Sequence, residues 1–183
     1  MSTTHTITTA EELGALPDDD VRRVLIRGKL YEMSPTAPWH GHVGARITSY
    51  LVQFVERHGL GVALTAETGF VLSATPDTVL APDAAFVRQE QLPPADEWDR
   101  FFRFAPDLAV EIVSPSDRGP SVQQKVSEYV RAGTRMVWVV DPRRKTVTVH
   151  SSDQPQRVLG GADQLDGGDV LPGFRLPLRD LFR

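Results

Sequence analysis

The sequence contains no cysteine, very few lysines and no long apolar run. Without cysteine the chain can form no disulfide, no thiolate zinc site and no cysteine nucleophile. No segment approaches the roughly 18–20 consecutive apolar residues that a membrane helix needs. Residues 1–6 have neither the basic nor the apolar region of a secretory signal. These absences predict a cytoplasmic protein with no membrane-spanning segment.

The net charge argues mildly against a general nucleic-acid binder, because such binding depends on neutralising phosphates. The 183 residues carry 20 basic and 24 acidic side chains, a net charge of −4. Residues 1–20 hold five of the acids and no Lys or Arg, so the remainder is nearly neutral. Seven basic residues against three acidic ones lie between Ser114 and Lys145. They form either a local basic face or a solvated helix face followed by a charged turn.

Length and patterning predict one α/β domain over residues 1–183, with residues 1–20 as an acidic N-terminal extension. Thr9-Ala10-Glu11-Glu12 has the form of a capping box and predicts a short helix to about Leu16. Apolar residues spaced three and four apart predict a long helix over 39–58, with Gly59 placed to end it.

Several strands are expected around these helices. The patterns predict two strands within 21–33 and others over 61–66, 69–73, 84–88, 108–113, 136–140 and 146–150. The strand over 108–113, a helix over 121–132 and the strand over 136–140 form a crossover unit, which favours a partly parallel sheet. Because the other strands have the pattern of hairpins, the fold is expected to be a mixed β-sheet flanked by helices.

Glu111 is the most informative residue, because the strand predicted over 108–113 is otherwise apolar. A carboxylate that is buried there without a partner costs several kcal/mol. Glu111 must therefore face solvent on a half-exposed strand, pair with a cation or bind a metal ion.

Asp83 is the second candidate acid and lies at the start of the strand predicted over 84–88. Alone, it has the context of an ordinary turn aspartate. Together with Glu111 it supplies two carboxylates from neighbouring strands, which magnesium-type ions bind along with substrate phosphate. A metal site at Asp83 and Glu111 is therefore expected.

Lys125 is one of only three lysines, against seventeen arginines. An ammonium can change its pKa and help to deprotonate a water molecule, whereas a guanidinium stays charged. Helical spacing places Lys125 and Tyr129 on one face of the helix that follows the Glu111 strand. That face is predicted to overhang the end of the strand, with an ordinary surface lysine as the alternative.

Glu32, Glu67 and His42 are weaker candidates. Glu32 lies near the end of the second N-terminal strand and Glu67 lies between two strands, so either completes a metal shell or is simply exposed. His40 and His42 open the long helix, but zinc needs more nitrogen ligands than the remaining scattered histidines offer. A contact with substrate or backbone is the expected role. The sequence contains no P-loop, no Gly-rich dinucleotide turn and no nucleophile-elbow serine.

A series of short motifs extends from about residue 21 to the end of the chain. They are Gly28 to Pro35, His42, Pro82-Asp83, Pro106 to Asp117, Lys125, Tyr129, Ala132-Gly133, Trp138 to Pro142, Leu171 to Phe174 and Leu181-Phe182. These motifs resemble the Uma-type family of restriction-endonuclease-like bacterial proteins, within the PD-(D/E)XK nucleases. The Glu-x-x-Ser-Pro-Ser stretch that begins at Glu111 is the most specific of them.

The resemblance implies a restriction-endonuclease-like core with acids that hold a divalent metal ion. Asp83 then corresponds to the motif aspartate and Glu111 to the acid of the (D/E)XK element. The sequence departs from the pattern at Val113, where the motif has lysine. Lys125 is the expected replacement, because its ammonium can reach the same volume from another backbone position.

Three functions follow from this interpretation. The first is a Mg2+- or Mn2+-dependent endonuclease on DNA, for which a homodimer is suited to cutting both strands. The second is a catalytically inactive protein of the same fold that binds nucleic acid or a protein partner. The third is a structural module in which Glu111 is merely exposed.

Overall fold

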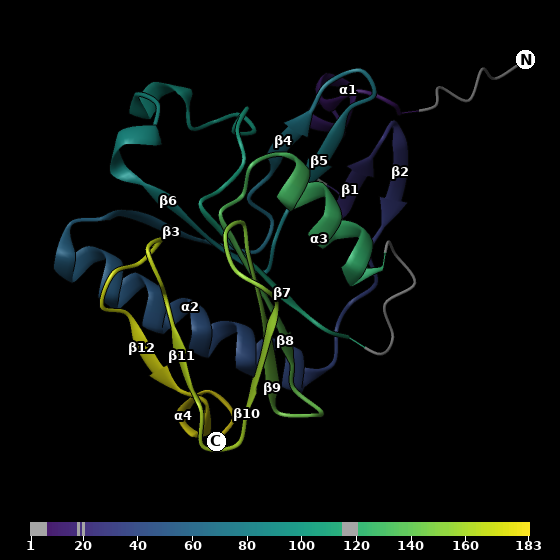
Figure 1. Cartoon of the computed structure of the whole chain (residues 1–183). Helices are drawn as coiled ribbons and strands as arrows, with labels where there is room; N and C mark the ends of the chain where they lie inside the picture. The colour runs from purple at the N-terminus through teal and green to yellow at the C-terminus, as the bar shows by residue number, and fades with distance from the viewer. Residues whose placement is uncertain (1–6, 18, 20, 115–120) are drawn as a thin grey trace, which may run out of the picture.

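The structure is a computed structural model that describes residues 7–17, 19, 21–114 and 121–183. Its centre is a six-stranded sheet with the strand order β10-β9-β8-β7-β6-β3 (Figure 1). The strands are β3 Gly61–Thr65, β6 Ala84–Arg88, β7 Leu108–Ile112, β8 Met136–Asp141, β9 Thr146–Ser151 and β10 Arg157–Gly160. β7 and β8 are parallel and the other described neighbours are antiparallel, which confirms the predicted mixed sheet.

A smaller, antiparallel sheet is built mainly from the N-terminal part of the chain. Its strand order is β2-β1-β5-β4. The strands are β1 Arg23–Ile26, β2 Lys29–Glu32, β4 Phe70–Ser73 and β5 Thr78–Leu80. Helix α1, Ala10–Gly14, begins at the predicted capping box of Thr9 and packs on this sheet through Ala10 and Leu13. Beyond β10 the chain forms a two-stranded sheet and a short helix: β11 Gln164–Asp166, β12 Arg175–Pro177 and α4 Leu178–Leu181.

Two helices cover opposite faces of the large sheet. Val110 and Ile112 of β7 pack in the same cluster as the apolar stripe of α2, Pro38–His58. Ala109, one residue away, packs instead with α3, Val122–Arg131. Because side chains alternate along a strand, Glu111 lies on the α3 face.

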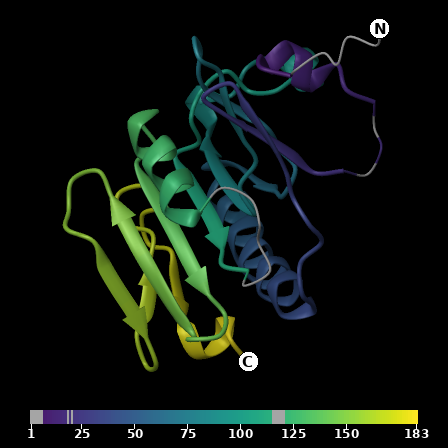
Figure 2. The same cartoon turned by 90° about the vertical axis from the view of Figure 1, so that its right-hand side faces the viewer.

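Helix α3, green in Figure 2, lies against the strands of the large sheet. Its buried Val126 and Tyr129 belong to one apolar cluster with residues of β7 and β8 of the large sheet and of β1 and β5 of the small sheet. The chain itself passes from β5 of the small sheet through Ala81, Pro82 and Asp83 into β6 of the large sheet. Both sheets therefore meet close to Asp83.

The structure confirms the predicted helix over 39–58 and the crossover unit β7–α3–β8. The short strands β5, β10, β11 and β12 were not predicted from the sequence. β10 is half-buried or exposed throughout and β5 has three residues, so neither has a clear apolar signature. Residues 115–120, between the strand predicted over 108–113 and the helix predicted over 121–132, lie outside the described residues. Among the described helices, none has both the length and the apolarity that crossing a membrane requires.

Gly61, the first residue of β3, tests how tightly this edge of the large sheet is built. It has φ 141°, and an added Cβ would lie 2.2 Å from the Val87 carbonyl oxygen. We expect Gly61→Ala to lower the free energy of unfolding by about 1–3 kcal/mol, measured by urea denaturation. Gly41→Ala in α2 is the matched control, since open space surrounds its Cβ position and alanine favours a helix. Equal stability of the two variants would contradict the close approach of β3 to β6.

Candidate active site

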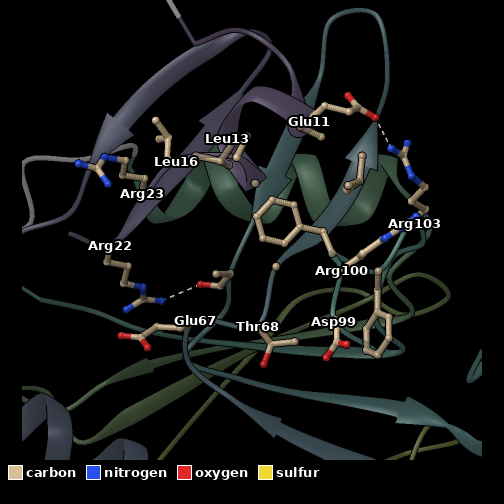
Figure 3. A pocket seen from close by; sticks show the side chains of 18 of the residues that line it. Glu11, Leu13, Leu16, Arg22, Arg23, Glu67, Thr68, Asp99, Arg100 and Arg103 are labelled. Atoms are coloured by element: carbon tan, nitrogen blue, oxygen red, sulfur yellow. Dashed lines mark hydrogen bonds and ion pairs between the residues drawn. The ribbon is translucent and has the colours of Figure 1, made fainter. Parts of the chain in front are cut away.

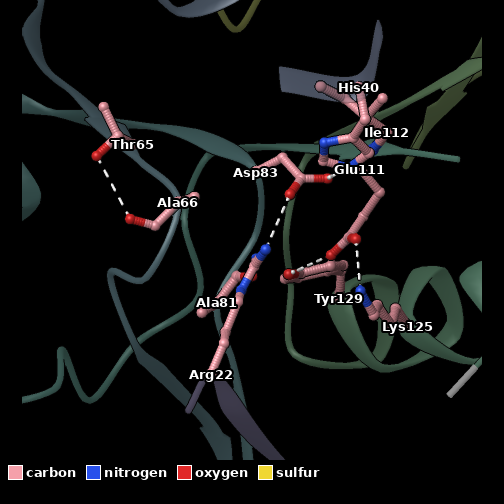
Figure 4. Close-up of polar contacts among 10 residues, drawn as sticks. All are labelled: Arg22, His40, Thr65, Ala66, Ala81, Asp83, Glu111, Ile112, Lys125 and Tyr129. Atoms are coloured by element: carbon pink, nitrogen blue, oxygen red, sulfur yellow. Dashed lines mark hydrogen bonds and ion pairs between the residues drawn. The ribbon is translucent and has the colours of Figure 1, made fainter. Parts of the chain in front are cut away.

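Glu111 is only 1% exposed, and both of its carboxylate oxygens are paired. Lys125 Nζ donates to Oε2 at 2.8 Å and the Tyr129 hydroxyl donates to Oε1 at 2.9 Å (Figure 4). Of the three options open to this acid, the structure shows pairing with a cation. The alternatives of a half-exposed strand and an ordinary surface lysine are wrong, because Glu111 and Lys125 are buried against each other.

The local sequence explains why α3 delivers both partners of Glu111. Ser121 caps the helix by accepting a hydrogen bond from the Gln124 amide at 3.2 Å. Lys125 and Tyr129 follow at a spacing of four, so they lie one turn apart on the same face. The crossover from β7 into β8 turns that face toward the sheet.

Asp83 lies beside Glu111 because it is bonded to the next residue of the same strand. The Ile112 amide donates to Asp83 Oδ2 at 2.7 Å, and the Asp83 amide donates to the Val110 carbonyl at 2.9 Å. Two cationic or potentially cationic side chains complete its surroundings (Figure 4). Arg22 donates from a terminal nitrogen to Oδ1 at 3.2 Å, and His40 Nε2 lies 3.4 Å from Oδ2.

The surroundings shift the pKa values of the two acids in opposite directions. Burial raises the pKa of Glu111, although the charge of Lys125 opposes the rise. Burial would also raise the pKa of Asp83, but the hydrogen bond with His40, the charge of Arg22 and the Ile112 amide together hold it below its ordinary value. Asp83 is therefore the firm anion, whereas Glu111 takes up a proton more readily.

Tyr129 serves as a neutral donor in this cluster. Its side chain is fully buried, and burial together with the nearby charge of Glu111 raises its pKa well above the ordinary value. The hydroxyl therefore keeps its proton and fixes the orientation of the Glu111 carboxylate through the bond to Oε1.

The donor set of the cluster suits magnesium better than zinc. Among the described residues, no group of three or more His, Asp or Glu side chains is arranged to hold a metal ion. Zinc needs three or four such protein ligands, whereas Mg2+ typically binds one or two carboxylates together with water and substrate phosphate. Asp83 and Glu111 meet the smaller requirement. Among the described residues, Asp83 Oδ1 and both Glu111 oxygens each have a single protein donor and so retain a second lone pair.

Two cavities border the cluster, and Arg22 lines both of them. The smaller, about 560 Å³, runs from Asp83 and His40 along the small side chains of α2. Its α2 lining is Gly41, Gly44, Ala45, Thr48, Ser49, Val52 and Gln53. The larger, about 1120 Å³, lies between α1, the turn after β3 and residues 98–103 (Figure 3). Arg22 is therefore the residue of this cluster that lies beside both cavities.

The weaker candidate residues make their contacts with groups other than Asp83 and Glu111. Glu32 is exposed and pairs with Arg23. Glu67 is exposed on the turn after β3, where it lines the larger cavity below Arg22 (Figure 3). His42 Nε2 lies 3.1 Å from the carbonyl oxygen of the C-terminal residue, so its polar contact is with backbone.

Arg22 was not a candidate from the sequence, and His40, expected to contact substrate or backbone, lies beside Asp83 instead. His40 precedes the buried Val43 by three positions and so shares its helical face, which is a signal that distinguishes it from His42. Arg22 gives no comparable signal, because it precedes a short strand that is distant from Asp83 in the sequence.

The expected basic face is smaller than the composition suggests. Lys125 is buried against a carboxylate, and Arg131 and Arg144 pair with acids of their own helix or turn. Arg118 lies outside the described residues. Lys125, Arg131 and Arg144 therefore already have acidic partners, so fewer basic side chains between Ser114 and Lys145 are free to bind phosphate than the composition suggests.

Comparisons with known proteins agree with this architecture. Residues 10–179 match the Uma2 family, which is described as "Putative restriction endonuclease". The fold also matches the crystal structure of "a putative nuclease belonging to DUF820" from Anabaena variabilis ATCC 29413, with a TM-score of 0.81 and 22% identity over 95% of this chain and 97% of that one. A likeness at this identity shows the fold alone, and the expected restriction-endonuclease-like fold is confirmed. A comparison with curated proteins gives no match.

Removing Lys125 tests the charge balance of the buried pair. We expect Lys125→Met to lower the free energy of unfolding by about 3–5 kcal/mol at neutral pH, because Glu111 would remain buried without its cation. The pKa of Glu111, already raised in the folded protein, rises further without Lys125. A raised folded-state pKa stabilises the protein below the ordinary Glu value and loses that contribution as the pH rises. The deficit should therefore shrink on acidification, which urea denaturation between pH 4.5 and 7.5 measures.

The double variant Lys125→Met/Glu111→Gln is the control for this experiment. It removes both charges, so we expect it to be less destabilised at neutral pH than the single variant. A single variant whose deficit does not change with pH would contradict the assignment of that deficit to the Glu111 charge.

Proposed function

The chain belongs to the Uma2 family, and from that membership we propose that it is a divalent-metal-dependent endonuclease that hydrolyses phosphodiester bonds in DNA. The observation that carries the proposal is that two buried acids meet at the end of β7. Asp83 accepts a hydrogen bond there from the amide of Ile112, the residue after Glu111. A cavity of about 560 Å³ reaches Asp83, so a substrate has a path to this junction.

In this proposal Asp83 and Glu111 hold Mg2+ or Mn2+ through their carboxylate oxygens. Such an ion, when bound, lowers the pKa of a coordinated water molecule and offsets the charge of the scissile phosphate. Asp83 is suited to this role because its lowered pKa keeps it ionised. The hydrogen bond from the Ile112 amide orients its carboxylate relative to β7.

Lys125 takes the role that the motif assigns to position 113. Val113 packs with apolar residues of the α3 face, whereas the Lys125 ammonium lies 2.8 Å from Glu111 Oε2. Lys125 thereby opposes the effect of burial on the Glu111 carboxylate by favouring its ionised form, and it holds a proton donor at the site. Tyr129 holds the other oxygen of Glu111, so the carboxylate is oriented from both sides.

The alternative function is a protein of the same fold that binds nucleic acid or a protein partner without cleaving it. One observation favours it: the charges of Asp83 and Glu111 are already balanced by Arg22 and Lys125. Under this reading the cluster is a stabilising ion-pair network, and divalent ions neither bind it nor raise the melting temperature.

Replacement of either acid separates the two functions. We expect Asp83→Asn and Glu111→Gln each to reduce Mg2+- or Mn2+-dependent cleavage of plasmid DNA at least about 100-fold, because each removes a charged ligand of the ion. We also expect both to lose the rise in melting temperature that the ion gives the wild-type protein. Gel electrophoresis and thermal unfolding are the two measurements.

Asp107→Asn is the matched control. Asp107 is also a buried acid, at the other end of β7, but its contacts are the amide and guanidinium of Arg88. We expect this variant to retain cleavage and the metal-dependent shift. Full cleavage by the Asp83 or Glu111 variant would overturn the assignment of the site. A wild-type protein that shows neither cleavage nor a shift would favour the binding function.

A further inference from the structure

Arg22 lies between the two cavities, and its guanidinium is incompletely bonded. One terminal nitrogen donates to Asp83 Oδ1 at 3.2 Å and the other donates to the Ala81 carbonyl at 2.7 Å. The Nε–H group is buried and has no acceptor among the described residues. A buried donor without an acceptor costs about 1–3 kcal/mol, so an incoming oxygen ligand that accepts from it is favoured.

The two cations of the cluster differ in their freedom to move. The Lys125 side chain is 5% exposed, and its ammonium lies 2.8 Å from its carboxylate. The Arg22 side chain is 20% exposed, its ion pair is longer and it borders both cavities. Arg22 is therefore the cation that can change partner without unpacking α3.

The charges of the cluster show what such a change accomplishes. Arg22 and Lys125 balance Asp83 and Glu111, so a divalent ion added to this arrangement brings two uncompensated positive charges. The charge of Arg22 also lies against Asp83 Oδ1, an oxygen that the ion needs. Guanidinium binds phosphate oxygens through two parallel hydrogen bonds, so a phosphodiester offers Arg22 a replacement for Asp83.

We propose that Arg22 is a phosphate-binding residue that, in the free protein, stands in for the divalent cation at Asp83. The inference rests on the proposed function. When a nucleic-acid strand enters, Arg22 takes a non-bridging phosphate oxygen as the acceptor of its Nε–H and releases Asp83 Oδ1. Cation and phosphate then bind with positive coupling, because each relieves the cost of displacing Arg22 for the other.

The first test measures Mn2+ binding to the full chain at pH 7.5 by isothermal titration calorimetry. We expect Arg22→Gln to bind Mn2+ about tenfold more tightly than the wild-type protein, because the competing cation is gone. Arg23→Gln is the matched control. It removes the same charge from the neighbouring residue, whose guanidinium pairs with Asp19 and Glu32 instead, and we expect its Mn2+ affinity to stay within about twofold of the wild type.

The second test measures the phosphate contact without metal. Binding of a fluorescent DNA duplex in EDTA, followed by anisotropy, should weaken about threefold to tenfold in Arg22→Gln and much less in Arg23→Gln. An unchanged or weaker Mn2+ affinity in Arg22→Gln, or no Mn2+ binding in any of the proteins, overturns the inference, as does unchanged DNA binding.

Arg22→Lys is the second variant in case Arg22→Gln does not fold. The Lys ammonium has one nitrogen in place of the two terminal nitrogens with which the guanidinium bonds Asp83 and Ala81, so it holds Asp83 less firmly. We therefore expect Mn2+ to bind about threefold more tightly than to the wild type. No gain would overturn the inference. A different outcome would refute the proposed function alone. In that outcome the wild-type protein does not cleave DNA in Mn2+, and the Arg22 variants still show the expected changes in binding.

Discussion

The buried ion pair between Glu111 and Lys125 is the interaction on which the site depends. It holds α3 against β7 and, with Tyr129, leaves the Glu111 carboxylate a single orientation. Asp83 accepts a hydrogen bond from the amide of Ile112, the next residue in β7, so its position is fixed relative to the same strand. The geometry of both acids is thus set by one strand and one helix of the crossover unit, which rigid packing supports on both faces.

Part of this site could be predicted from residue types alone. A single glutamate in an apolar strand, a rare lysine and a tyrosine one turn later indicated Glu111, Lys125 and Tyr129, since a buried charge needs a partner. Arg22 and His40 could not be assigned in the same way. Their contacts with Asp83 depend on how the small sheet and α2 dock on the large sheet, and such long-range packing leaves no periodic signal in a short segment.

The fold was easier to predict than its edges. The long α2 and the β7–α3–β8 unit have strong apolar patterns, and the structure confirms both. The strands β5 and β10 are short or exposed, so their apolar signal is weak and pairing with neighbours defines them instead. Under the proposed function, the ammonium that the motif places at position 113 comes instead from Lys125 of α3, which lies 2.8 Å from Glu111 Oε2.

Because the two sheets contribute different residues to the site, the site depends on how they dock. Arg22 immediately precedes β1 and is anchored there by the bond from the Met33 amide to its carbonyl, whereas Asp83 is bonded to β7. The small sheet therefore carries Arg22, whereas the large sheet carries the two acids. Local opening of the small sheet would move Arg22 away from Asp83 and would uncover Val126 and Tyr129 of α3, which pack in one apolar cluster with Val24 and Leu80 of the small sheet. Loss of site integrity can precede global unfolding, so a sample that retains its secondary structure need not retain an assembled site.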